Sequence, residues 1–189
     1  SIKGKELRIW SAGCSTGEEV YSLAICLDEY LQKTDNTDIA VKIFASDISE
    51  KCVEKARTGV YAAQDLKNVS EKRLSSYFTK RDSGYYINKA IRDTCIFAVH
   101  DLTKDFPFSK IDFIVCRNVL IYFNTELQGQ VLSAFHYALR ENGFLFLGKA
   151  ETALTIPNLF SAVEKQEKIF MRQDAAVRLT PNLLLKEES

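Results

Sequence analysis

Short, nearly continuous apolar runs alternate along the chain with stretches whose apolar residues recur at helical spacing. Runs of this length are typical of strands buried on both faces of a parallel sheet. Their alternation with helices predicts an α/β fold with a doubly wound, mostly parallel sheet and a Rossmann-like topology. The predicted strands of this sheet are Leu7–Trp10, Val41–Ala45, Ile96–Val99, Phe113–Cys116 and Phe144–Leu147.

Three helices are predicted in the first half of the chain. The first begins at Glu18, and its apolar residues from Val20 to Leu31 fall on one face. Ser49 and Ser70 are residue types that cap helix N-termini, so each is expected to begin a shorter helix.

The second half of the chain is predicted to contain one longer helix and an antiparallel pair of strands. Thr125 and Gln128 form the pattern of a capping box, and Asn142-Gly143 is expected to end that helix. Two β-prone segments, Phe160–Val163 and Ile169–Arg172, are separated by charged residues and are expected to pair as the last strands.

A small β-subdomain is expected at about residues 77–92. Two β-compatible arms, Tyr77–Lys80 and Tyr85–Asn88, flank the turn-forming residues Asp82–Gly84, which is the pattern of a hairpin. The segment Gly59–Val69 before it is expected to be irregular. We expect residues 1–173 to form one domain and residues 174–189 to be a tail or linker.

The composition excludes several classes of function. Lys and Arg number 25, as do Asp and Glu, so no net field would attract a nucleic acid. Five scattered cysteines without a Cys-x-x-Cys pair indicate neither a disulfide framework nor a zinc site, and they suggest a reducing cytoplasm. Only two histidines are present, and no metal ligand set is expected. The apolar runs are too short for a membrane span, so no direct membrane insertion is expected.

Polar side chains are predicted to collect at the carboxyl ends of four strands. Ligands of doubly wound sheets bind at this edge, near the point where the strand order reverses. The four features are the loop Ser11–Glu19, Asp47, Asp101 and the pair Arg117-Asn118.

The loop between the first strand and the first helix predicts a ligand with a cationic end. Its small residues, Gly13 and Gly17 among them, permit close approach of a ligand to the backbone. Glu18 and Glu19 at the helix start would repel a dinucleotide pyrophosphate but suit the ammonium and sulfonium of S-adenosylmethionine. The alternative is that both acids only complement the helix dipole.

Each of the other three features has a structural alternative. Asp47 is in the position of a ribose-binding acid, or it caps the next helix. Asp101-Leu102 would bracket an adenine edge, or it forms an ordinary turn. Arg117-Asn118 would line the middle of the ligand site, and Tyr122 would point its hydroxyl there unless Ile121–Phe123 are core residues.

The chain resembles the CheR-type chemotaxis receptor methyltransferases over about residues 6–172. The resemblance implies a class I S-adenosylmethionine-dependent methyltransferase, with the antiparallel last strand and small β-subdomain of that family. It also implies the catalytic C-terminal domain, because the family's N-terminal helical domain has no counterpart in these residues. The segments that carry the resemblance are Trp10–Ser22, Phe44–Ser49, Lys55–Tyr61, Cys116–Phe123 and Phe144–Glu151.

The resemblance also implies a reaction, a substrate and a set of site residues. The family transfers methyl groups to glutamate side chains on the cytoplasmic helices of chemoreceptors, which suggests a monomeric cytoplasmic enzyme with a protein substrate. By position, Glu19 with Glu18 would hold the methionine ammonium and Asp47 the ribose. Arg117 and Tyr122 are the expected catalytic residues. The residues expected to bind the cofactor are Ser11, Ala12, Gly13, Glu18, Glu19, Asp47, Ile48, Asp101, Leu102, Arg117 and Asn118.

Three alternative functions differ from this one in the methyl acceptor, in turnover or in the cofactor. The same chemistry on a protein outside chemotaxis, or on a small molecule, is compatible with the sequence. A cofactor-binding regulatory module without turnover is a second alternative. A nicotinamide-dependent oxidoreductase fits poorly, because Gly13 and Gly17 are followed by two acids where a pyrophosphate would lie.

Overall fold

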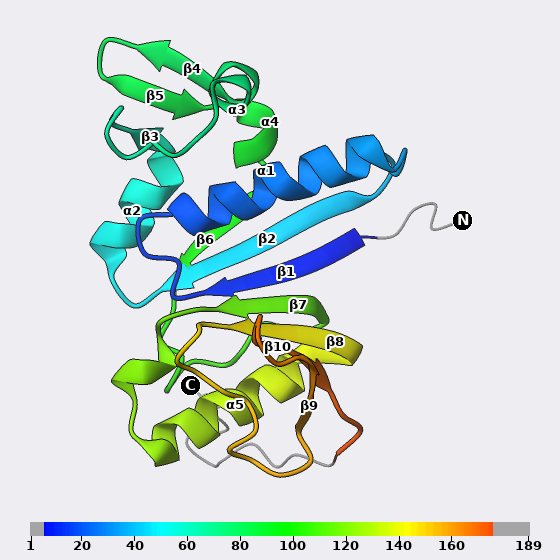
Figure 1. Cartoon of the computed structure of the whole chain (residues 1–189). Coiled ribbons are helices and arrows are strands. Elements are labelled where there is room, and N and C mark those ends of the chain that lie inside the picture. The colour runs from blue at the N-terminus through cyan, green and yellow to red at the C-terminus, as the bar shows by residue number, and fades with distance from the viewer. Residues whose placement is uncertain (1–5, 176–189) are drawn as a thin grey trace, which may run out of the picture. The chain divides into compact units, whose positions relative to one another are not determined.

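The computed structural model describes residues 6–175 of the chain (Figure 1). These residues form two compact units, which are described separately. Unit 1 contains Glu6 and Cys14–Val99, and unit 2 contains Leu7–Gly13 and the chain from His100 onward. The predicted tail at 174–189 lies almost entirely outside the described residues.

Unit 1 is built on a parallel pair of strands, β2 (Ala40–Asp47) and β6 (Cys95–Val99). Helix α1 (Glu18–Lys33) contacts β2, and helix α2 (Glu50–Thr58) contacts both strands. The Ser49 hydroxyl accepts a hydrogen bond from the Cys52 amide, so the predicted cap of α2 is confirmed. The core between these elements is apolar, and Ile43, Ala45, Val53 and Ala56 are fully buried.

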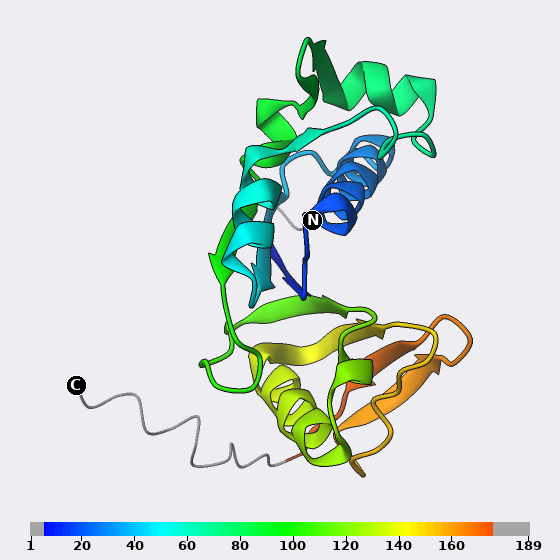
Figure 2. The ribbon, with the colours of Figure 1, turned by 90° about the vertical axis from the view of Figure 1, so that its left-hand side faces the viewer.

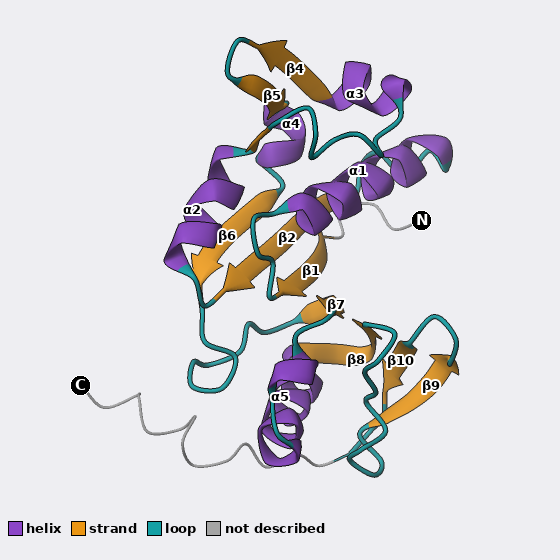
Figure 3. Ribbon diagram, turned by 60° about the vertical axis from the view of Figure 1, so that its left-hand side comes forward, coloured by secondary structure: helices purple, strands orange, loops and turns teal. Residues whose placement is uncertain are grey.

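A second, smaller sheet in unit 1 has the strand order β3-β5-β4 and is antiparallel; Figure 1 labels its three strands and Figure 3 shows β4 beside β5. Strands β4 (Phe78–Arg81) and β5 (Gly84–Ile87) form the predicted hairpin. The expectation of an irregular segment at 59–69 was wrong at its start, because β3 (Val60–Tyr61) pairs with β5. A two-residue strand has too little sequence for an alternating pattern to be recognised.

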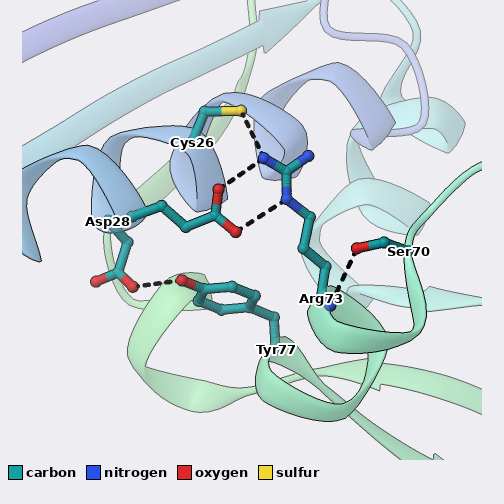
Figure 4. A network of polar contacts seen from close by, with 6 residues as sticks. Cys26, Asp28, Ser70, Arg73 and Tyr77 are labelled. Atoms are coloured by element: carbon teal, nitrogen blue, oxygen red, sulfur yellow. Dashed lines mark hydrogen bonds and ion pairs between the residues drawn. The ribbon is translucent and has the colours of Figure 1, made fainter. Parts of the chain in front are cut away.

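Two short helices flank the hairpin, and α3 is bound to α1 by polar contacts (Figure 4). Helix α3 (Glu71–Tyr77) begins at the predicted cap Ser70, and α4 (Lys89–Arg92) follows β5. Arg73 pairs with Glu29 of α1 at 2.6 Å, and this hydrogen bond lowers the pKa of the Glu29 carboxyl. The Tyr77 hydroxyl donates to Asp28 at 2.8 Å, and burial raises the pKa of Tyr77 to about 12. The hydroxyl therefore keeps its proton and donates at neutral pH.

Unit 2 contains five strands in the order β1-β7-β8-β10-β9. Strand β7 is parallel to both β1 and β8, whereas β10 is antiparallel to β8 and to β9. Figure 2 shows helix α5 beside β8, where Val131, Leu132 and Phe135 are fully buried. The elements are β1 (Glu6–Ala12), β7 (Ile111–Cys116), the 3-10 helix η1 (Leu120–Tyr122), α5 (Thr125–Ala138), β8 (Leu139–Leu147), β9 (Phe160–Glu164) and β10 (Ile169–Arg172).

The α/β class, the mostly parallel sheet with antiparallel last strands and the small additional sheet are confirmed. Each predicted strand of the main sheet overlaps an observed one, because the apolar runs are the segments buried on both sides. No helix among residues 6–175 is long and apolar enough to cross a membrane.

Both predicted ends of α5 were wrong. The cap is Asn124, whose side-chain oxygen accepts from the Leu127 amide at 2.9 Å. The Gln128 side chain does not complete a capping box, because it donates to the carbonyls of Leu120 and Phe123. The helix ends at Ala138, where buried Leu139 turns extended and begins β8.

Asn142 and Gly143 lie inside β8 rather than after a helix. Asn142 has a φ of +59°, and the pairing of β7 with β8 jumps from Ile111↔Leu139 to Phe113↔Phe144 at this point. The Asn-Gly pair therefore allows a bulge, which requires the same left-handed backbone as a helix C-cap. This shared requirement explains the wrong prediction.

Candidate cofactor site

In unit 1, Asp47 braces the loop that precedes α1. One carboxylate oxygen of Asp47 accepts from the Ser15 amide at 2.8 Å, and the other accepts from the Ser49 amide at 2.9 Å. Each oxygen has a further lone pair, so these bonds leave acceptor sites for ribose hydroxyls. Asp47 is not the cap of α2, which is Ser49, but it holds the amide of that cap residue, and this contact does not conflict with ligand binding.

The first turn of α1 places two acids at the positive end of the helix dipole. The Thr16 hydroxyl lies 2.7 and 2.8 Å from the two carboxylate oxygens of Glu18, which is exposed. Glu19 is half-buried beside it. Gly17 precedes them with a φ of +92°, and no side chain caps the helix. Negative charge therefore collects at this end of unit 1.

Tyr61 of β3 supports the same loop, and sequence reasoning gave it no role in the site. Its hydroxyl donates to the Thr16 carbonyl at 2.9 Å, and burial raises the pKa of Tyr61, so this proton is retained. The small sheet is thereby hydrogen-bonded to the loop before α1. The only sequence signal was the position of Tyr61 at the end of a segment that carries the family resemblance.

In unit 2, the end of β1 lies beside the end of β7. The register Ser11↔Val115 brings the residues that follow both strands together. Ser11 and Ala12 are buried, so their contribution to a ligand site would come from the backbone. Gly13 has a φ of +77°, and a Cβ there would lie 2.4 Å from a methyl group of Val119. Gly13 therefore packs directly on the turn that follows β7.

That turn is held by a buried carboxylate, Glu151, which is 4% exposed. One oxygen accepts from the amides of Val119 and Leu120, both at 2.8 Å. The other accepts from the amides of Asn118 at 3.0 Å and Gly148 at 2.6 Å. In the sequence, Glu151 stands out only as the last residue of a segment that carries the family resemblance. An acid three residues after the glycine that follows a buried strand is the signal that was available.

The turn presents three of the predicted site residues. The Arg117 guanidinium lies 5.2 Å from the centre of the Phe146 ring, and Asn118 is exposed with a φ of +58°. Tyr122 is 80% exposed and Ile121 is 50% exposed, whereas Leu120 is buried. The alternative that Ile121 and Tyr122 are core residues is therefore wrong. In unit 1, Ile48 is likewise 69% exposed directly after Asp47.

Asp101 takes part in a local turn. One oxygen accepts from the Thr103 amide and hydroxyl, and the other pairs with Lys104 at 3.3 Å. Burial acts to raise the pKa of Asp101, but the bonds from Thr103 and Lys104 outweigh it and lower the pKa. The Asp101-Leu102 pair thus has the geometry of the turn alternative, and an adenine contact there stays a prediction.

No metal-ligating cluster of His, Cys, Asp and Glu occurs among residues 6–175. His136 is buried, and its Nε2 lies 2.8 Å from the Gln173 carbonyl. The Cys14 thiol in the loop before α1 is also buried, and burial together with the nearby Asp47 charge raises its pKa to about 12. Cys14 is therefore a packing residue of the loop and not a thiolate nucleophile at neutral pH.

Comparisons with known proteins identify the family of this chain. The family model described as the CheR methyltransferase, SAM binding domain matches residues 1–169. This match identifies the chain as an S-adenosylmethionine-binding methyltransferase domain. The chain belongs to the CheR methyltransferase family, and its cofactor is S-adenosylmethionine.

Three relatives illustrate the similarity. Chemotaxis protein methyltransferase 1 of Pseudomonas aeruginosa is 35% identical over 89% of this chain and 63% of its own length. Chemotaxis protein methyltransferase 2 of Vibrio cholerae is 36% identical over 83% of this chain and 55% of its own. An uncharacterized 104.1 kDa protein of Rhodobacter capsulatus is 38% identical over 88% of this chain and 17% of its own. The chain thus spans less than two thirds of each relative.

The residues present in each unit suit this cofactor. In unit 1, the acids of α1 complement an ammonium group, and Asp47 keeps acceptor sites for hydroxyls. In unit 2, the backbone of Gly13 packs directly on Val119 in the turn after β7. Glu151 fixes that turn by accepting from its amides. The acids of unit 1 complement a cationic, hydroxyl-bearing ligand better than a pyrophosphate.

Proposed function

We propose that this chain forms γ-methyl esters on glutamate side chains of the cytoplasmic helices of chemoreceptors. The observation that carries the proposal is the acid-bearing loop–helix braced by Asp47, found in a chain that belongs to the CheR family. Relatives named chemotaxis protein methyltransferases support the chemoreceptor as the substrate. The partner is then a protein helix, and we propose that the chain acts as a monomer in the cytoplasm.

The cofactor residues take the roles proposed from the sequence. Glu19 with Glu18 holds the methionine ammonium, and Asp47 holds the ribose hydroxyls. Ile48 also binds the cofactor, and its 69% exposed side chain is available for contact. In unit 2, Asp101-Leu102 meets the adenine edge. Ser11, Ala12 and Gly13 provide backbone contacts, and Arg117 and Asn118 line the site.

The proposed catalysis rests on positioning rather than on a general base. The cofactor supplies an electrophilic methyl group on a sulfonium. A glutamate side chain is ionised at neutral pH, so no residue has to remove a proton from it. Arg117 holds the acceptor carboxylate, and the exposed Tyr122 orients it toward the methyl–sulfur bond. The protein then has to align the acceptor carboxylate with the methyl–sulfur bond and exclude water.

Calorimetric binding of S-adenosylhomocysteine tests the cofactor site. Wild type is expected to bind at micromolar concentration, and Asp47→Ala to lose at least about tenfold in affinity because the ribose acceptor and the loop brace are both removed. The matched control is Asp38→Ala, which changes an exposed acid of the same unit and should leave affinity unchanged. Equal affinity in both variants would contradict the role of Asp47.

Transfer of a labelled methyl group tests the reaction. The label should appear on a chemoreceptor cytoplasmic fragment and be released by base, as expected for an ester. Arg117→Ala and Tyr122→Phe should each slow transfer by about 10- to 100-fold. Labelling of a different signalling protein would instead indicate the same chemistry on a protein outside chemotaxis. Cofactor binding without any transfer would indicate a regulatory module.

A further inference from the structure

We propose that Glu151 is a positioning residue for methyl transfer, and that its buried carboxylate sets the conformation of the turn that carries Arg117, Asn118 and Tyr122. This inference rests on the proposed function for the roles of those three residues. Glu151 is not expected to touch cofactor or substrate. It acts through the backbone of residues 118–120.

Three consecutive amides of the turn point at one carboxylate. Those of Asn118, Val119 and Leu120 lie 3.0, 2.8 and 2.8 Å from the oxygens of Glu151. Successive backbone amides that converge on an anion form a nest, which is a concavity that binds negative charge. The conformation of the turn therefore depends on the charge of Glu151.

The fourth donor comes from the segment that carries Glu151 itself. The Gly148 amide donates to the carboxylate at 2.6 Å, and the Glu151 amide donates back to the Gly148 carbonyl at 3.0 Å. This closes the chain after β8 into a compact loop. Charge-assisted bonds from four amides offset the desolvation of a carboxylate that is only 4% exposed.

The loop and the turn fit together without spare room. A Cβ on Gly148 would lie 2.6 Å from the Asn118 side-chain oxygen and 2.7 Å from a Glu151 oxygen. The register Cys116↔Leu147 explains this contact, because it brings the residues after β7 and β8 side by side. The turn after β7 is thus shaped by the loop after β8.

The backbone of the turn contains a left-handed residue. Asn118 adopts a φ of +58°, which asparagine tolerates better than most residues, and the Glu151 carboxylate accepts from the amide of this same residue. Arg117 precedes this residue, and η1 with Tyr122 follows it. A change in the turn would therefore move the groups proposed to hold the acceptor carboxylate.

The substitution Glu151→Gln tests the inference. The amide keeps the size of the side chain but presents an NH₂ group to two N–H donors, so the nest opens. We expect hydrogen exchange of the amides at 118–120 to accelerate at least about tenfold. We also expect kcat for methyl transfer to fall about tenfold or more at a temperature where circular dichroism shows the variant fully folded. Glu151→Asp should recover part of both losses because it restores the charge.

Two control variants separate positioning from stability. Glu141→Gln removes an exposed acid of β8, the strand before the loop that carries Glu151, and should change neither exchange nor kcat. Leu132→Ala removes a buried side chain of α5 and should lower the melting temperature, while leaving exchange at 118–120 and kcat near wild type in the folded protein. If Glu151→Gln behaves like Leu132→Ala, the residue is only structural and the inference is overturned.

The outcomes also distinguish this inference from the proposed function. Faster exchange with unchanged kcat in Glu151→Gln would overturn the positioning role and leave the proposed function standing. A wild-type protein that does not methylate receptor fragments would refute the proposed function. In that case, accelerated exchange together with an at least tenfold weaker affinity for S-adenosylhomocysteine would support Glu151 as a positioning residue of the cofactor site. Unchanged exchange and affinity would overturn it.

Discussion

Single residues decide whether the loop before α1 can take its shape. Gly17 has a φ of +92°, and a Cβ there would lie 2.8 Å from the Ala56 Cβ and 2.9 Å from the Tyr61 hydroxyl oxygen. Tyr61 in turn donates to the Thr16 carbonyl, so the glycine and the tyrosine fix the loop together. The loop is thus tied to α2 and to the small sheet before any ligand binds.

The substitution Gly17→Ala should be damaging. We expect the free energy of unfolding to fall by about 1–3 kcal/mol, because the left-handed backbone and the close contacts both become strained. The affinity for S-adenosylhomocysteine should fall at least about tenfold. Chemical denaturation and calorimetry measure the two effects.

A second glycine provides the control. Gly129 lies in α5, and a Cβ there would meet only a methyl group of Ile156 at 3.8 Å. Gly129→Ala should therefore stabilise the protein by up to about 1 kcal/mol through helix propensity and leave affinity unchanged. Similar losses in the two variants would contradict the assigned role of Gly17.

At the scale of elements, the predictions succeeded where burial alone determines the structure. Apolar runs predicted the parallel strands, and Ser49 and Ser70 were found as caps, because one dominant contact decides each case. The predictions failed where two neighbouring residues were equally suitable as a helix cap, as at Asn124 and Thr125. They also failed at Asn142-Gly143, because this pair can either end a helix or bend a strand. Short-range patterns do not separate such alternatives.

The cap of α5 can be tested directly. Asn124→Ala should lower the free energy of unfolding by about 1 kcal/mol, because the Leu127 amide loses its acceptor. Thr125→Ala, at the position first expected to be the cap, should change stability by less than about 0.5 kcal/mol. Urea denaturation followed by circular dichroism gives both values. A larger loss for Thr125→Ala would show that the cap lies one residue later.

For the whole molecule, the sequence predicted the class of ligand better than the groups that shape the site. The acids Glu18, Glu19 and Asp47 were visible because they follow predicted strands or begin a helix. The roles of Tyr61 in unit 1 and of Glu151 in unit 2 were not visible, because each acts on backbone groups far away in the sequence. Contacts of 30 or more residues in separation depend on register, which the apolar pattern leaves open.

The stability of the whole chain should depend on pH through His136. Burial desolvates the imidazolium and lowers the pKa of His136, and the nearby Arg172 acts in the same direction, against the opposing bond to Gln173. At mildly acidic pH the unfolded chain, with an ordinary histidine pKa near 6.5, therefore binds a proton that the native state does not. Stability is thus present above about pH 6.5 and is lost as the pH falls below it, at a rate of at most about 1.4 kcal/mol per pH unit.

Urea denaturation at pH 7.5 and at pH 5.5 checks this expectation, with His136→Gln as the comparison. The glutamine amide can still donate to the Gln173 carbonyl but does not titrate, so the variant should lose less stability than wild type between the two values. Asp101 does not confuse the result, because its lowered pKa makes a contribution that is lost only near pH 4 and below. An equal loss of stability in both proteins would mean that His136 binds its proton in the folded state as readily as in the unfolded chain. The buried ring would then have to keep its charge beside Phe160, at 5.7 Å between ring centres, which its 1% exposure opposes.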